Sequence, residues 1–137
     1  MTGPADFDRQ VLDAVEDLVP LWFSVVEDVT PRLSPRQILA LRAVRRRPEL
    51  NLTALAEQLG VGLPTASRLC DRLEAAGLLR RCARLGDRRE VHLEVTARGR
   101  GFLVEVSERL AALLTDALGA LPPTERARVE QVLRALP

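Results

Sequence analysis

Apolar side chains recur every three or four residues near both ends of the chain, a spacing typical of amphipathic helices. Within residues 6–29 the stripe consists of Phe7, Val11, Val15, Leu18, Trp22, Val25 and Val29. Pro20 lies inside this stripe and is expected to kink or split the helix, because proline lacks a backbone donor and clashes with the preceding turn. A long helix over 97–119 carries Leu103, Val106, Leu110, Leu113, Leu114, Ala117 and Leu118 on its inner face, and a last helix within 121–137 carries Val129, Val132, Leu133 and Leu136.

The middle of the chain opens with a helix over 34–47 that has clear start and stop signals. Ser34 can cap it, Pro35 suits the first helical position, and Gln37 completes a capping box. Pro48 ends the helix after a run of three arginines.

Two short helical patterns follow in close succession. We expect Thr53 to cap the first and Gly60 to end it. The second runs from Pro64 to Gly77, with Ala66, Leu69, Leu73 and Ala76 on one face and Thr65, Ser67, Arg68, Asp71 and Arg72 on another. Two short helices joined by a tight, glycine-containing turn predict a helix-turn-helix.

Strict alternation then replaces the helical spacing. Val91, Leu93 and Val95 read as a half-buried strand, and Gly86 and Asp87 lie where two strands would reverse direction. The order of elements is therefore four helices, a hairpin and two helices. We predict a mainly α fold with a small β-hairpin, a winged helix-turn-helix flanked by helices.

Charge is distributed unevenly along these elements. The 137 residues carry a formal net charge of +1, and every basic residue is an arginine. Residues 1–31 hold one arginine and seven acids, 32–100 hold fifteen arginines and seven acids, and 101–137 hold four arginines and five acids. The near-neutral total thus conceals a basic middle, which favours a surface that meets a polyanion.

Composition excludes several classes of protein. An apolar fraction of 47% and a charged fraction of 28% are those of an ordinary globular domain. The longest uncharged apolar run, residues 18–26, is too short to cross a bilayer, and the acidic N-terminus lacks an apolar targeting segment, so we expect a cytoplasmic protein.

Catalytic groupings are missing from the sequence. His92 is the single histidine, and alternation places it on the strand face opposite Leu93, where solvent is expected. No Ser-His-acid or Cys-His grouping and no glycine-rich phosphate loop occurs, so we predict no catalytic residue, no enzyme activity and no cofactor.

Two cysteines leave a thiol- or metal-responsive sensor open as an alternative. Cys70 and Cys82 are expected to be free thiols, and arginines near Cys82 can lower its pKa. Cys70, Cys82 and His92 could hold zinc with one acid, but they lack the usual spacing of zinc ligands. We therefore predict no metal site, and small-residue packing is the simpler interpretation of Cys70.

The helix-turn-helix and the basic hairpin together favour DNA binding. Hydroxyl and guanidinium groups at the start of a second helix match base edges in a major groove. An arginine at a hairpin tip can enter a minor groove, and Asp87 can accept a hydrogen bond from Arg89 and so orient it. A winged-helix module that docks a protein partner instead remains the other alternative.

Three segments carry a family resemblance: LTALAEQLGV, TASRLCDRLEAAGLLRR and GDRREVHLEVTARGR. The chain resembles the multiple-antibiotic-resistance regulator (MarR) family, most specifically in the D-x-R of the wing, Asp87 and Arg89. The pattern L-x-V-T-x-x-G at Leu93, Val95, Thr96 and Gly99 strengthens it. The resemblance implies a homodimeric transcriptional regulator, most often a ligand-responsive repressor, that binds a pseudo-palindromic operator in double-stranded DNA.

The resemblance also implies residue roles. Thr65, Ser67 and Arg68 would face bases, Arg72 the DNA backbone, Arg89 the minor groove with Asp87 bracing it, and Arg84 and Arg88 phosphates. Residues 1–33 and 97–137 would form a helical dimerisation region around a DNA-binding region at 34–96, all in one compact chain. A small hydrophobic or aromatic effector would bind between them, with Trp22 and Phe23 as weak candidates.

Overall fold

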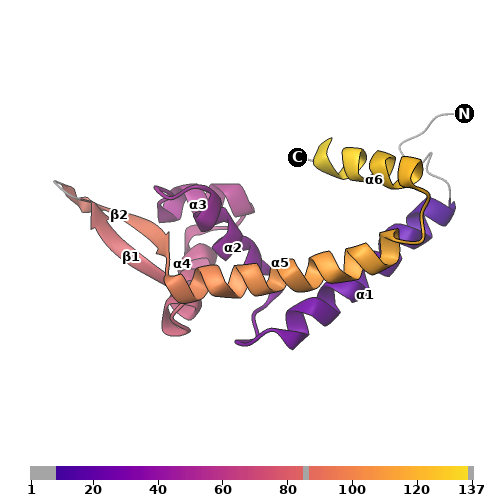
Figure 1. Cartoon of the computed structure of the whole chain (residues 1–137). Helices are drawn as coiled ribbons and strands as arrows, with labels where there is room; N and C mark the ends of the chain where they lie inside the picture. The colour runs from indigo at the N-terminus through magenta and orange to yellow at the C-terminus, as the bar shows by residue number, and fades with distance from the viewer. Residues whose placement is uncertain (1–8, 85–86, 136–137) are drawn as a thin grey trace, which may run out of the picture.

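The computed structural model describes residues 9–84 and 87–135, except for the side chains of Gln10, Val11, Ala14, Arg84 and residues 87–90. The elements are α1 (Arg9–Asp28), α2 (Pro35–Arg46), α3 (Leu52–Leu59), α4 (Leu63–Ala75), β1 (Leu79–Arg84), β2 (Asp87–Val95), α5 (Ala97–Leu118) and α6 (Pro123–Ala135). The hairpin projects from one end, the long α5 runs beside α1 toward the other end, and α6 folds back there (Figure 1). The predicted winged helix-turn-helix fold is confirmed.

Most helix boundaries follow local sequence signals. The capping box of α2 is confirmed: Gln37 N donates to Ser34 Oγ at 3.2 Å, and Ser34 N donates to Gln37 Oε1 at 2.6 Å. The expected cap of α3 at Thr53 is wrong, because the helix begins two residues earlier and Asn51 Oδ1 accepts from Ala54 N at 2.8 Å. Asn51 has the extended backbone that an N-cap needs, whereas Thr53 lies inside the first turn. Pro20 does not split α1, which runs unbroken from Arg9 to Asp28.

One hydrophobic core lies where α2, α4, the hairpin and the neighbouring ends of α1 and α5 meet. Its largest fully buried side chains are Ile38, Leu41, Leu55, Leu73, Leu78, Leu79, Leu93 and Leu103. Val25 and Val26 bring the C-terminal half of α1 into the same core. Burial of this apolar surface is the main favourable contribution to the stability of the fold.

The junction between α4, the hairpin and α5 explains the T-x-x-G pattern. Thr96 Oγ1 accepts from Gly99 N at 3.0 Å and donates to the carbonyl oxygen of Gly77 at 2.6 Å. A Cβ at Gly99 would collide with the carbonyl oxygen of Leu78 and lie 2.7 Å from Val95 Cγ1. Glycine is therefore required by close packing, and this contact sets where α5 leaves the hairpin.

Both ends of the chain leave apolar side chains in solvent. No residue of α6 is buried, although all thirteen are described. Val15 and Leu18, expected on the inner stripe of α1, are 55% and 44% exposed. Val91 also departs from the expected alternation at 41% exposed, because it lies further along the hairpin than the core reaches, unlike Leu93. Among the described helices, none is long and apolar enough to cross a membrane.

Candidate nucleic-acid interface

Helices α3 and α4 form the helix-turn-helix through a short glycine turn. Gly60 ends α3 with a left-handed backbone at φ 67°, a conformation that glycine adopts without steric cost. Val61 N then donates to the carbonyl oxygen of Ala56 at 3.0 Å, and Gly62 is the N-cap of α4. Chain reversal within these few residues brings α3 against α4.

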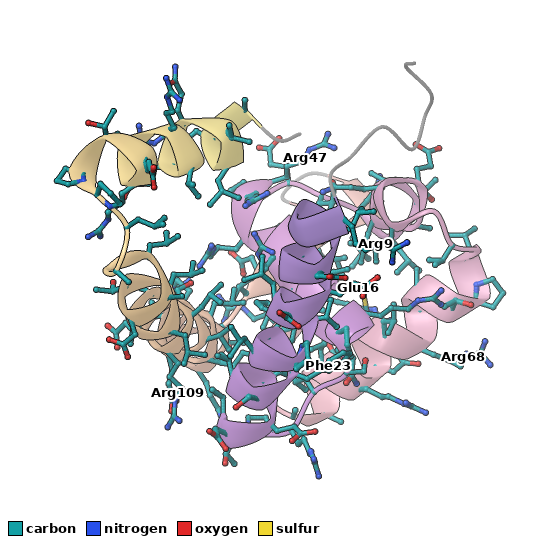
Figure 2. All side chains as sticks on the ribbon, turned by 90° about the vertical axis from the view of Figure 1, so that its right-hand side faces the viewer. Arg9, Glu16, Phe23, Arg47, Arg68 and Arg109 are labelled. Carbon is teal, nitrogen blue, oxygen red and sulfur yellow. The ribbon has the colours of Figure 1, made fainter. Side chains whose placement is uncertain are left out.

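The predicted recognition residues all lie on α4. Its inner face is occupied by Ala66, Leu69, Cys70 and Leu73, which are buried. Thr65 and Ser67 are half-buried near the start of the helix, whereas Arg68 and Arg72 are exposed. Figure 2 shows Arg68 projecting outward from α4. The helix therefore separates an apolar face that packs from a polar, basic face that solvent reaches.

The wing is a two-stranded antiparallel sheet. Its register pairs Leu79 with Val95 and Ala83 with Val91, and it shifts between Ala83 and Arg84. The hairpin itself was predicted. Gly86 lies outside the described residues, and so do the side chains of Arg84, Asp87, Arg88 and Arg89. The hydrogen bond by which Asp87 would orient Arg89 therefore stays a prediction.

Arg81 has a role that sequence reasoning missed. Its guanidinium nitrogens lie 3.0 Å from Asp71 Oδ1 and 3.0 Å from Glu74 Oε1, both on α4. The backbone N of Arg81 also donates to Glu74 Oε2 at 3.3 Å. Arg81 thus joins the wing to α4 and offsets part of the negative charge of two acids that border the basic face. A signal was present, because alternation puts Arg81 on the same strand face as the buried Leu79.

The other face of the hairpin contains a polar cluster. Glu94 Oε2 lies 2.9 Å from Arg80 Nε and accepts a hydrogen bond from Cys82 Sγ, also at 2.9 Å. His92 is half-buried beside them rather than solvent-facing, so that expectation is wrong. The backbone of His92 also forms an isolated antiparallel bridge with Asn51, in the turn before α3.

The two thiols differ from each other and from expectation. The hydrogen bond to Glu94, with some burial, raises the pKa of Cys82, so the prediction that arginines would lower this pKa is wrong. The same hydrogen bond and the one from Arg80 lower the pKa of the Glu94 carboxyl. Cys70 is fully buried in α4, and burial raises its pKa to about 11. Both thiols are therefore protonated at neutral pH.

A small cavity lies between α1, α2 and α5. It measures about 100 Å³ and is lined by Trp22, Arg42, Arg45, Leu103, Val106, Ser107 and Leu110. Burial lowers the pKa of Arg42, and the positive charges of Arg46 and Arg45 add to this effect. Phe23 does not line the cavity: it is 44% exposed on the outer side of α1 (Figure 2). Of the two weak effector candidates, the structure brings only Trp22 to a cavity.

Comparison with known proteins gives consistent matches. Residues 33–91 match the profile of the MarR family. The transcriptional repressor MprA of Escherichia coli is 37% identical over 78 residues, which are 57% of this chain and 44% of MprA. The matched part thus spans less than half of that curated relative.

Solved structures match over nearly the whole chain. RV1404 from Mycobacterium tuberculosis has a TM-score of 0.84 at 26% identity, covering 98% of this chain and 95% of that one. A MepR mutant from S. aureus, solved bound to an oligodeoxyribonucleotide, has a TM-score of 0.73 at 17% identity, covering 94% and 95%. The second likeness concerns the fold alone.

Proposed function

We propose that the protein is a transcriptional regulator of the MarR type that binds duplex DNA and acts as a ligand-responsive repressor, a proposal supported by the match of residues 33–91 to the MarR family. The observation that carries this proposal is the two-sided character of α4. Its apolar face is buried, Arg68 and Arg72 are exposed, and Arg81 pairs with the neighbouring Asp71 and Glu74. This pairing offsets part of the negative charge that would otherwise repel phosphates beside the basic face.

Each contact has a distinct proposed role. Thr65, Ser67 and Arg68 read base edges in the major groove, because hydroxyl and guanidinium groups match the donors and acceptors there. Arg72 binds the DNA backbone. In the wing, Arg89 enters the minor groove with Asp87 bracing it, and Arg84 and Arg88 bind phosphates. Base contacts set specificity, whereas phosphate contacts set affinity and its salt dependence.

The proposed regulator is a homodimer built through its helical ends. Exposed apolar side chains on α1 and α6 support this: Leu12, Val15, Leu18, Val19, Val132 and Leu133. A two-fold partner would bury them, and it would place two recognition helices on a pseudo-palindromic operator with half-sites about one helical turn apart. We assign residues 1–33 and 97–137 to this dimerisation region and 34–96 to DNA binding.

The DNA proposal is tested with genomic fragments selected on the full-length protein. Arg68→Ala and Arg89→Ala should each weaken binding by about 1–3 kcal/mol in fluorescence anisotropy. Arg109→Ala is the matched control, because Arg109 is an exposed arginine on α5 that pairs with Glu105 at 3.3 Å, away from α4. Wild-type affinity should also fall steeply with salt. A flat salt response, or equal losses for all three variants, would overturn the proposal.

We further propose that a small aromatic or hydrophobic acid binds in the cavity at Trp22. Burial, and then the positive charges of Arg46 and Arg45, lower the pKa of Arg42, so a carboxylate placed there would offset this positive charge. Trp22 is the single tryptophan of the chain, so its fluorescence reports on this cavity alone. Aromatic acids should change that emission saturably, and Arg42→Ala should abolish the change. An uncharged analogue with equal affinity would contradict the carboxylate role.

A further inference from the structure

The outer face of the hairpin brings a thiol, an imidazole and a carboxylate together. Cys82 on β1 lies directly opposite His92 on β2, and Glu94 follows His92 by two residues, which returns it to the same face. One potential ligand atom from each of the three side chains lies within 4.8 Å of the other two. None of these atoms has a role in the DNA contacts proposed above.

These three groups are the ligand types that zinc prefers. Zinc binds thiolate sulfur at about 2.3 Å, imidazole nitrogen at about 2.0–2.1 Å and carboxylate oxygen at about 2.0–2.2 Å, in tetrahedral geometry. Ligand atoms of such a tetrahedron lie roughly 3.5 Å apart. Cys82 Sγ and Glu94 Oε2 are 2.9 Å apart, and the ligand atoms of all three residues lie within 4.8 Å of one another, so side-chain displacements on the order of 1 Å separate this arrangement from a coordinating one.

We propose that Cys82, His92 and Glu94 form a three-ligand site for a zinc-like divalent cation, with water in the fourth position. On binding, the S–H bond of Cys82 is replaced by a sulfur–metal bond, and its proton passes to solvent. The thiolate and the Glu94 carboxylate then balance the two charges of the ion, while neutral His92 donates a nitrogen lone pair. Cation binding is thereby compatible with a hairpin rich in arginine.

Groups around the cluster support its geometry. Arg80 Nε lies 2.9 Å from Glu94 Oε2 and can keep the carboxylate oriented while the other oxygen turns to the ion. The backbone of β2 is held from outside the hairpin as well, since Leu93 N donates to the carbonyl oxygen of Leu50 at 2.9 Å. His92 and Glu94 therefore project from a strand that is hydrogen-bonded on both edges, which favours a preorganised site.

Cys70 does not belong to this site. It is fully buried on the inner face of α4, among apolar side chains of the core. The ion would instead join β1 to β2 at the base of the wing, and it would stiffen the hairpin that presents Arg84, Arg88 and Arg89. The proposed site rests on the geometry of the protein without DNA, and it goes beyond the proposed function. It can therefore be tested in the absence of DNA.

The test is a titration of the reduced, full-length protein with Co²⁺, which gives an intense thiolate-to-metal absorption band when cysteine coordinates it. Wild type should develop this band saturably at one ion per chain. Cys82→Ser should lose it, whereas His92→Ala and Glu94→Gln should weaken affinity at least tenfold. Cys70→Ala is the matched control and should keep the band, and melting curves check that each variant folds.

Zinc gives a second readout on the same variants. At about 100-fold excess over its dissociation constant, Zn²⁺ should raise the melting temperature of wild type by roughly 5–15 °C and leave Cys82→Ser unchanged. Absence of the cobalt band, its persistence in Cys82→Ser, or unaltered affinity in both His92→Ala and Glu94→Gln overturns the site. Loss of DNA binding by Arg68→Ala is independent of these results, so failure of one proposal is distinguishable from failure of the other.

Discussion

The winged unit (residues 34–96) and the helical ends (9–33 and 97–135) differ in how completely they bury their apolar faces. Helices α2 and α4 bury their inner residues almost fully, including Ile38, Leu41 and Leu73. By contrast, α6 buries nothing, and among its described side chains α1 buries only residues in its C-terminal part, Val25 and Val26. Helices with apolar stripes are therefore buried in the winged unit but partly exposed at the helical ends of the same chain.

The contrast shows what a helical stripe implies. An apolar stripe predicts that one face of a helix is buried, but it does not predict which surface covers that face. The apolar faces of the winged unit are covered within the chain, since its helices and hairpin fold over a common core together with the neighbouring ends of α1 and α5. At the helical ends the cover is incomplete, which is why we propose a second copy of the chain there. Substitutions in the winged unit should therefore act mainly on folding, and substitutions at the helical ends mainly on assembly.

The largest effect is expected at the junction where the winged unit meets α5. Gly99→Ala should destabilise the protein by about 3 kcal/mol, because the new methyl group overlaps Leu78 backbone atoms that cannot move independently. Gly101→Ala is the matched control, since nothing lies within 4 Å of a Cβ there. Alanine has a higher helix propensity than glycine, so the free energy of unfolding of Gly101→Ala should equal or exceed that of wild type. Urea unfolding monitored by circular dichroism distinguishes the two, and equal stabilities would refute the steric argument.

The helical ends should respond through assembly rather than folding. Val15→Asp combined with Leu18→Asp should raise the dimer dissociation constant about 30-fold, or about 2 kcal/mol, because the interface would bury two carboxylates. Leu63→Asp is the control: Leu63 is 49% exposed, comparable to both, but belongs to the winged unit. Analytical ultracentrifugation should find monomer only in the double variant. Unchanged association there would remove the basis for the proposed interface.

The smallest effect concerns the buried thiol of the winged unit. Cys70 has a pKa of about 11 in the folded protein against an ordinary 9.0, so between these values the unfolded state ionises first. The contribution of Cys70 to the free energy of unfolding should be fully present below pH 9, and it should fall by about 1–2 kcal/mol as pH rises to 11. The chain has no lysine or tyrosine, which leaves the two thiols as the groups that titrate in this interval. Cys70→Ala should flatten the pH dependence of the unfolding free energy, and a slope equal to that of wild type would contradict this assignment.

Local signals predicted most of the fold correctly. Ser34 with Gln37, Gly60 and Gly77 mark helix ends by backbone chemistry that acts within a few residues. The error at α3 was local too, because Asn51 and Thr53 are both good caps and only the surrounding chain decides between them. Helical periodicity placed Arg68 and Arg72 on the exposed face of α4, whereas their proposed roles toward DNA came from the family resemblance.

Contacts between elements could not be read in the same way. Arg81 was counted as one more basic residue of the wing, but its partners, Asp71 and Glu74, come from α4. His92 was expected alone in solvent, but strand register places it opposite Cys82. Register depends on the turn and on which strand face the core covers, and neither is encoded near the residues themselves.

By itself, the sequence determined the order and type of the elements and the basic face of α4, because propensity, periodicity and local backbone requirements act over short distances. Only the tertiary structure decided that Arg81 joins the wing to α4, that Cys82, His92 and Glu94 meet on one face, and that α6 stays uncovered within the chain. These outcomes depend on distances between residues far apart in sequence, which are set when the core packs.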